Sequence, residues 1–189
     1  KEKKYIFDYT SKKTIVMSNG VLNNSKVYRS NYQNYKIKNK NKNISIGFLG
    51  RFDVFIKGLD NLLDAYSDFQ KLDTETKIDL VFIGAHSKTK EFDSEKYFRK
   101  IRSKLTNPKR FIVKGPFYDK KKWFELSKLD ILIQPSRTEG MPNTVLEAMS
   151  MAIPCCVSKE TNMGEIILSS DSGWVINRDK ENLLRFFCE

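Results

Sequence analysis

Two carboxylates, Glu139 and Glu147, flank a predicted turn from a strand into a helix. The apolar run over residues 131–133 predicts a short buried strand. Pro142 predicts the first helical turn, where the absent N–H would have had no partner. Such a junction leaves free backbone N–H groups at the positive end of the helix dipole, where a phosphate can bind. Helical side chains lean back toward the N-terminus, so Glu147 should point at the helix start.

Glu139 and Glu147 would repel a bound phosphate, but they could accept hydrogen bonds from hydroxyl groups attached to that phosphate. A ribose diol or a sugar carries such groups, and the acidic residue of dinucleotide-binding folds uses them in this way. The alternative is that Glu139 is a solvated loop residue and Glu147 a surface helix residue. The surrounding sequence favours the first interpretation.

Two cations lie on a separate predicted loop. Arg51 and Lys57 fall within residues 50–58, which follow a predicted strand over residues 44–49. A loop at the carboxyl end of a strand lies where open α/β sheets bind ligands. Taken alone, this stretch could equally be an exposed basic loop. Together with the helix start near Pro142, it predicts one pocket that neutralises a pyrophosphate.

Short apolar runs alternate with segments whose apolar residues recur at helical spacing. The runs predict strands over residues 44–49, 77–83, 110–113, 131–133, 153–157 and 173–176. The segments between them predict helices over residues 59–69, 88–107 and 123–129, one from Pro142, and one capped by Asp179. This alternation predicts an α/β fold, a Rossmann-like parallel sheet flanked by helices with right-handed crossovers.

The first 43 residues follow a different pattern. Residues 1–13 are polar with scattered aromatics and predict a helical turn or tail. Residues 14–21 predict a short strand that ends in an Asn-Gly turn. Residues 22–43 are rich in Asn, Lys and Tyr without periodicity, which predicts a linker. The basic run over residues 36–42 is interpreted as solvated charge rather than a nucleic-acid contact.

The composition is that of a globular chain, and its charge indicates an anionic partner. The 189 residues include 34 basic and 23 acidic residues, a net charge of +11. The three cysteines are too few and too badly spaced for a disulfide framework or a zinc site, and His86 is the only histidine. No run approaches the ~20 apolar residues of a membrane helix and no signal peptide is visible, which favours a cytoplasmic protein. The chain starts at Lys1, which predicts a fragment of a longer protein.

The stretch around the two carboxylates resembles a known family. Residues 136–149, Ser-Arg-Thr-Glu-Gly-Met-Pro-Asn-Thr-Val-Leu-Glu-Ala-Met, are similar to the signature of the retaining glycosyltransferases of family 4. Further similarity lies in three shorter stretches, residues 19–21, 50–58 and 153–157. The sequence departs from the family at one usual proline and three usual glycines, which are here Ser18, His86, Ala152 and Asn162.

The resemblance implies the C-terminal half of a GT-B glycosyltransferase, whose two Rossmann-like domains face each other across a cleft. Residues 1–43 would be the end of the N-terminal domain and the interdomain linker, and residues 44–189 the donor-binding domain. The implied activity transfers a sugar from a nucleoside-diphosphate sugar to a glycan or lipid-linked acceptor, with retention of anomeric configuration. Without the acceptor domain, this half is expected to bind a nucleotide weakly and to transfer no sugar.

The resemblance also implies roles for individual residues. Arg51 and Lys57 would grip the donor diphosphate and Glu139 would contact hydroxyl groups of the donor sugar, which makes these three the expected catalytic residues. Glu147 would bind the ribose. Further donor contacts are expected from residues of two loops, Gly140, Met141, Asn143 and Thr144 in one, and Gly115 and Phe117, beside the nucleobase, in the other.

No metal and no cofactor beyond the nucleotide-sugar substrate are expected, because no Asp-x-Asp triplet occurs. The expected partners are the sugar donor, the N-terminal acceptor domain and an anionic membrane at the inner face of the cell, but no nucleic acid. The alternatives are a non-catalytic nucleotide-binding module or another GT-B enzyme such as an epimerase. A phosphorylase would need a pyridoxal phosphate lysine, for which no motif is present. The absence of Walker-type and Gly-x-Gly-x-x-Gly loops disfavours nucleotide triphosphatases and dinucleotide oxidoreductases.

Overall fold

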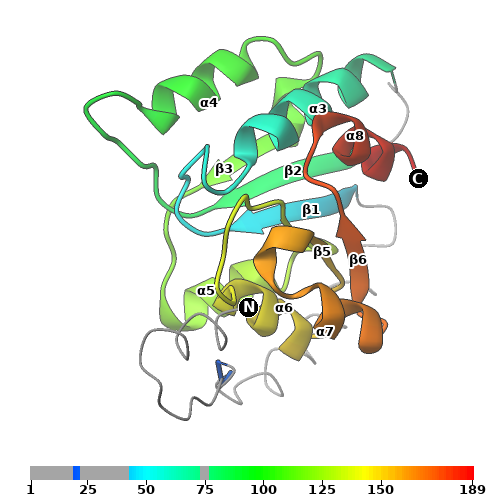
Figure 1. Cartoon of the computed structure of the whole chain (residues 1–189). Coiled ribbons are helices and arrows are strands. Elements are labelled where there is room, and N and C mark those ends of the chain that lie inside the picture. Colours follow the sequence, from blue (N-terminus) through cyan, green and yellow to red (C-terminus); the bar gives the residue numbers. More distant parts are fainter. Residues whose placement is uncertain (1–18, 22–42, 73–76) are drawn as a thin grey trace, which may run out of the picture.

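The computed structural model describes residues 19–21, 43–72 and 77–189 (Figure 1). Six parallel strands form one sheet, namely β1 (Ile44–Leu49), β2 (Ile78–Ile83), β3 (Phe111–Lys114), β4 (Ile131–Gln134), β5 (Cys155–Ser158) and β6 (Gly173–Ile176). The helices between them are α3 (Leu59–Leu72), α4 (Ser94–Arg102), α5 (Asp119–Leu126), α6 (Asn143–Ser150), α7 (Gly164–Ser169) and α8 (Lys180–Cys188). The predicted Rossmann-like parallel sheet is confirmed.

The strand order β3-β2-β1-β4-β5-β6 locates the ligand-binding edge. The chain builds outward from β1 through β2 and β3, then returns to pair β4 with β1 on the other side. Adjacent connections therefore diverge at the carboxyl ends of β1 and β4, which is where doubly wound sheets open a crevice for ligands. The loops that leave these two ends are residues 50–58 and 135–142.

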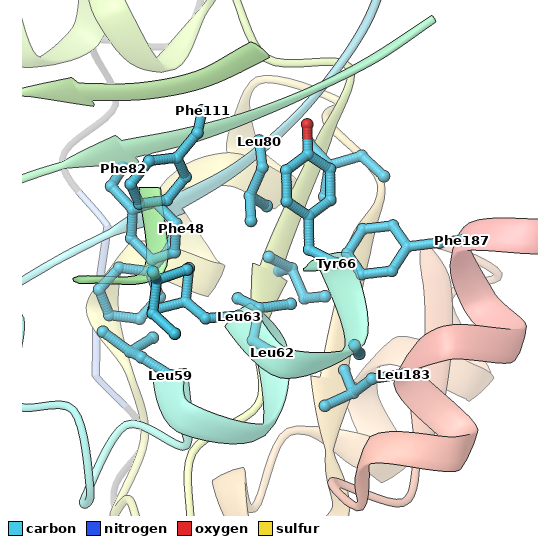
Figure 2. Close-up of a cluster of buried hydrophobic side chains, with 14 of the residues drawn as sticks. Phe48, Leu59, Leu62, Leu63, Tyr66, Leu80, Phe82, Phe111, Leu183 and Phe187 are labelled. Carbon is cyan, nitrogen blue, oxygen red and sulfur yellow. The ribbon is translucent and has the colours of Figure 1, made fainter. Parts of the chain in front are cut away.

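Helices cover both faces of the sheet (Figure 1). On one face, α3, α4 and α8 pack against aromatic and aliphatic side chains of the strands, including Phe48, Leu80 and Phe82 (Figure 2). Tyr66 of α3 lies in this cluster and donates its hydroxyl to the Ile78 carbonyl oxygen at 3.0 Å. On the other face, α5, α6 and α7 bury the second cluster, which includes Trp123, Val145, Ala148 and Ile167. Two closed cores thus hold the sheet rigid beneath the two loops.

Several predicted elements differ from those observed. The helix predicted over residues 88–107 is observed only as α4. It begins after Asp93, because the Asp93 carboxylate accepts from the backbone N–H groups of Glu95 and Lys96 at 3.0 and 3.1 Å, and it ends at Arg102. Pro142 is the N-cap of α6 rather than its first helical residue. Of the strand predicted over residues 14–21, residues 19–21 are not in a strand. Residues 1–18 and 22–42, with the predictions made for them, fall outside the described part of the chain.

The other predicted elements agree with the structure to within a few residues, whereas α7 was not predicted. Asp179 caps α8 as predicted, its carboxylate accepting from the Asn182 N–H at 2.9 Å. Within the described ranges, no helix is both long and apolar enough to cross a membrane.

A buried ion-pair network on α5 predicts acid sensitivity. Glu125 has 9% of its side chain exposed and accepts from Lys114 Nζ at 2.5 Å and from Lys128 Nζ at 2.6 Å. Burial raises the pKa of Glu125, but the two lysine hydrogen bonds outweigh it, and the folded-state pKa lies below the ordinary value of 4.5. The stabilisation is therefore fully present above pH 4.5 and is lost as the pH falls through the folded-state pKa.

Glu125→Gln is expected to lower the free energy of unfolding at pH 7 by about 1–3 kcal/mol, because two charged hydrogen bonds are lost. Its unfolding free energy should also change less than that of the parent chain between pH 5 and pH 3. Urea denaturation at several pH values measures both effects. Glu95→Gln, which removes an exposed partner of Arg99 on α4, is the matched control. Parallel pH profiles for the parent chain and Glu125→Gln would contradict the assignment.

Candidate donor-binding site

A pocket of about 410 Å³ lies at the carboxyl ends of β1 and β4. It is lined by residues of β1, β4, their two following loops and the start of α6, namely Leu49, Gly50, Arg51, Lys57, Gln134, Glu139, Met141, Pro142, Asn143 and Thr144. The structure therefore brings the two predicted cations, the predicted sugar-binding carboxylate and the helix start into one pocket. The pocket joins two cationic side chains to the free N–H groups of a helix N-terminus, a combination suited to a phosphate group.

Glu139 is held by three donors on one carboxylate oxygen. Its Oε1 accepts from Lys57 Nζ at 2.5 Å, from Ser136 Oγ at 2.9 Å and from Gln134 Nε2 at 3.1 Å. Lys57 and Glu139 are both largely buried, so this ion pair is shielded from water. Within the described residues, Oε2 has no hydrogen-bond partner, which leaves one oriented acceptor available to a ligand hydroxyl.

The backbone at Glu139 is fixed from the neighbouring β5–α7 connection. The Glu139 N–H donates to the Glu160 carbonyl oxygen at 3.1 Å. Asn162 Nδ2 donates to the carbonyl oxygens of Glu139 and Gly140 at 2.7 and 3.1 Å. Asn162 has φ of +57°, a left-handed conformation that glycine adopts most easily and asparagine next. This asparagine therefore adopts a backbone conformation that glycine also favours and adds an amide that holds the Glu139 loop, a role that no local sequence pattern predicts.

Arg137 joins the two loops of the pocket. Its guanidinium binds both carboxylate oxygens of Asp60 on α3, at 2.7 and 2.8 Å, and also donates to the Phe55 carbonyl oxygen at 2.5 Å. The Arg137 N–H donates to the Ile56 carbonyl oxygen at 2.8 Å. The loop that carries Lys57 is thus tied to the loop that carries Glu139. No local sequence pattern predicts this role, because Asp60 and Arg137 are 77 residues apart.

At the rim of the pocket, Arg51 is exposed, whereas the start of α6 is contacted by Asn19. Arg51 has 68% of its side chain exposed and its Nη2 lies 3.8 Å from Asp53 Oδ2, so the guanidinium is largely available. Asn19 donates from Nδ2 to the Met141 carbonyl oxygen and to Asn143 Oδ1, both at 3.0 Å. Asn19, in the segment predicted to lead between domains, therefore lies against the start of α6.

Four predicted donor contacts do not line this pocket. Glu147 of α6 accepts from Lys122 Nζ of α5 at 2.6 Å. Gly140 is exposed, and its carbonyl oxygen accepts from Asn162 as described above. Gly115 is exposed after β3, and Phe117 packs against the second core with Lys121 Nζ 4.6 Å from its ring centroid. Across the described part of the chain, no group of three or more histidine, cysteine or acidic side chains could hold a metal ion.

Comparison with known proteins places the chain in a family. A family model described as "Glycosyl transferases group 1" matches residues 30–185. The chain belongs to this family. Protein CapJ of Staphylococcus aureus is 31% identical over 159 residues, which cover 79% of this chain and 37% of CapJ. This group 1 glycosyltransferase chain therefore spans little more than a third of that relative.

Solved structures share the fold of this group 1 chain. The C-terminal domain of a group 1 family glycosyl transferase, LpcC from Francisella tularensis, superposes with a TM-score of 0.63 at 18% identity over 89% of this chain and 86% of that one. Anabaena Alr3699/HepE, in complex with UDP and glucose, gives a TM-score of 0.67 at 17% identity over 93% of this chain and 46% of that one. The fold is that of the C-terminal, Rossmann-like half of a GT-B glycosyltransferase.

Arg137→Ala is expected to weaken binding of a nucleoside diphosphate about threefold to tenfold, because Lys57 is no longer held beside the start of α6. Isothermal titration calorimetry measures the affinity, and a double-mutant cycle with Lys57→Ala tests the mechanism. If Arg137 acts through Lys57, its substitution should have no further effect in the Lys57→Ala background. Arg99→Ala, which removes an exposed arginine of α4, is the control. Full additivity of the two substitutions would contradict the positioning role.

Proposed function

We propose that this chain is the donor-binding domain of a retaining, family 4-like glycosyltransferase. The enzyme would transfer a sugar, of the hexosyl type, from a nucleoside-diphosphate sugar to a glycan or lipid-linked acceptor without a divalent metal ion. One observation carries the proposal, the pocket in which Arg51, Lys57 and the start of α6 surround Glu139. The UDP and glucose bound to the similarly folded HepE support a nucleotide sugar as the ligand.

The chemical task is to stabilise a nucleoside diphosphate as it leaves an oxocarbenium-like sugar. Arg51, Lys57 and the N–H groups at Asn143 and Thr144 would supply positive charge at that leaving group, and such preorganised donors act most strongly where charge develops. Glu139 would orient the sugar, because its Oε2 remains an unoccupied acceptor beside the diphosphate site.

Three predicted contacts would hold the nucleoside. Glu147 would accept from the ribose diol through Oε2, since Oε1 already accepts from Lys122. Gly115 and Phe117, on the loop after β3, would hold the base. Lys122 holds the Glu147 carboxylate in one orientation, as Lys57 holds that of Glu139. Each carboxylate would therefore be oriented before its ligand binds.

The acceptor would be bound by a preceding domain. The chain spans 37% of CapJ and 46% of the HepE chain, which leaves room in such proteins for a second half. The junction segment at Asn19 lies against the start of α6 and would deliver that half to the mouth of the pocket. The enzyme would act in polysaccharide or lipid-linked glycan synthesis in the cytoplasm, and the net charge of +11 supports its contact with an anionic membrane face.

Calorimetric titration with UDP, GDP and ADP, each with Mg²⁺ and with EDTA, tests this function. We expect binding of at least one nucleotide with the same affinity in both buffers, and no sugar transfer by this chain alone. Replacing Arg51 and Glu147 together with alanine should weaken that binding at least about tenfold, because a charged partner of the phosphate and one of the ribose are both lost.

The matched control replaces Arg99 and Glu95, an exposed pair of the same two residue types on α4. Unaltered binding in the Arg51 and Glu147 double variant would refute the site assignment. Failure of all three nucleotides to bind the parent chain would refute the proposed function itself.

A further inference from the structure

A second pocket, of about 560 Å³, lies at the opposite edge of the sheet from the pocket around Lys57 and Glu139, which we call the donor pocket. It is bounded by the end of α6, the turn that leads into β5 and the turn between α7 and β6. The two residues before β5, Ile153 and Pro154, and the first two residues of β6, Gly173 and Trp174, also line it, so we call it the amino-end pocket. It shares no lining residue with the donor pocket.

The apolar part of the amino-end pocket centres on an accessible indole. Trp174 has 45% of its surface exposed, although it is one of the largest apolar side chains of the protein. Phe186 of α8 lies edge-on to the indole, with ring centroids 5.6 Å apart, which fixes the orientation of the Trp174 ring. Met149, Ile153 and Pro154 extend the apolar wall. The pocket therefore offers a flat aromatic surface held in place.

The polar part lies on one turn beside the indole. Asp171 lines the pocket, and within the described residues its carboxylate has no hydrogen-bond or ion-pair partner. Ser170 and Ser172 flank Asp171, with their hydroxyl oxygens 2.8 Å apart. Asp171 is left-handed, with φ of +47°, and so is Ala152 across the pocket, with φ of +54°. Each of these residues follows a helix, Ala152 after α6 and Asp171 after α7, where a left-handed residue commonly ends the helix.

The chemistry of these groups selects a class of ligand. An anion would be repelled by the Asp171 carboxylate. A cation would be repelled by the net charge of +11 on the chain. A neutral polyol can donate paired hydroxyl groups to the carboxylate while its C–H face lies on the indole. Pockets that bind small ligands combine an apolar wall with a few such polar groups.

We propose that the amino-end pocket binds neutral carbohydrate, a stretch of glycan chain held apart from the donor pocket. Such a site would keep the acceptor or product glycan on the enzyme between transfers. This inference rests on the proposed glycosyltransferase function, but it does not depend on which residues bind the donor.

Tryptophan fluorescence gives a direct test, because the chain has two tryptophans and Trp123 is buried, with 6% exposed. The Trp123→Phe variant leaves Trp174 as the single reporter. We would titrate it with maltohexaose, cellohexaose and chitohexaose, and with a hyaluronan hexasaccharide as the anionic comparison. A saturable change is expected with at least one neutral oligosaccharide and none with hyaluronan.

Asp171→Gly should weaken that binding about fivefold or more, because hydrogen bonds to a charged group are lost. Asp119→Gly is the matched control, since Asp119 is also exposed with φ of +47° and glycine relieves the same strain at both positions. Circular dichroism verifies folding of each variant. Lys57→Ala should leave oligosaccharide binding unchanged.

Three outcomes would overturn the proposal: no saturable change with any neutral oligosaccharide up to its solubility limit, equal effects of Asp171→Gly and Asp119→Gly, or loss of the signal with Lys57→Ala. Nucleotide binding is measured separately on the same proteins. Failure of this inference would therefore be seen as persistent nucleotide binding without oligosaccharide binding.

Discussion

Lys57→Ala is expected to weaken binding of a nucleoside diphosphate by about tenfold to a hundredfold. A hydrogen bond to a charged group contributes about 1.5–3 kcal/mol, and each 1.4 kcal/mol corresponds to about a factor of ten in affinity. Lys57 lines the donor pocket beside the start of α6, and its ammonium is already placed by Glu139 at 2.5 Å. Little side-chain entropy is then lost when the diphosphate binds. Isothermal titration calorimetry with UDP or GDP measures the change.

The controls separate a local contact from net charge. Lys71→Ala removes the same charge from α3, where the side chain is 59% exposed and pairs with Asp68 far from the pocket. Glu139→Gln removes a negative charge next to Lys57, so binding of the free nucleoside diphosphate should be unchanged or tighter. If Lys57→Ala and Lys71→Ala weaken binding equally, the effect is one of long-range charge and the pocket assignment is wrong.

The sheet could be predicted from the sequence because its strands are short, apolar and separated by helical periodicity. β2 is buried at every position, and four consecutive apolar residues after Asp79 mark it clearly. The strand order could not be predicted, because the backbone pairing of β1 with both β2 and β4 leaves no mark in the local sequence. The helix expected over residues 88–107 was too long at both ends. It begins only after the Asp93 cap, and it ends at Arg102 although the apolar spacing continues to Leu105.

The pocket was predictable as far as fold topology determines it. Arg51, Lys57 and the start of α6 all follow the carboxyl ends of strands, and parallel strands bring those ends to one edge. The contacts that tune the pocket were not predictable. Arg137 meets Asp60, and Asn162 meets the carbonyl oxygens of Glu139 and Gly140, through side chains distant in sequence.

Gly58→Ala is expected to destabilise the protein by about 3 kcal/mol or more. Gly58 has φ of +65°, and a left-handed conformation costs a residue with a Cβ about 1–2 kcal/mol. An added Cβ would also lie 2.1 Å from the Pro135 carbonyl oxygen, a backbone atom that no side-chain rotation can move aside. The loop of Lys57 would have to separate from the loop of Glu139, so nucleotide binding should be lost together with stability. Urea denaturation and calorimetry measure the two effects.

Substitutions at two other glycines are the controls for this prediction. At Gly20 an added Cβ meets nothing within 4 Å, so Gly20→Ala should leave both stability and nucleotide binding nearly unchanged. At Gly47 the Cβ would approach the Leu129 side chain at 2.4 Å, which can yield by rotation, so Gly47→Ala should cost stability but spare nucleotide binding. Of these three glycines, only Gly58 would place its Cβ against a backbone atom, in the loop that carries Glu139. A Gly58→Ala variant as stable as Gly20→Ala would mean that the two loops are not packed as the Arg137 contacts require.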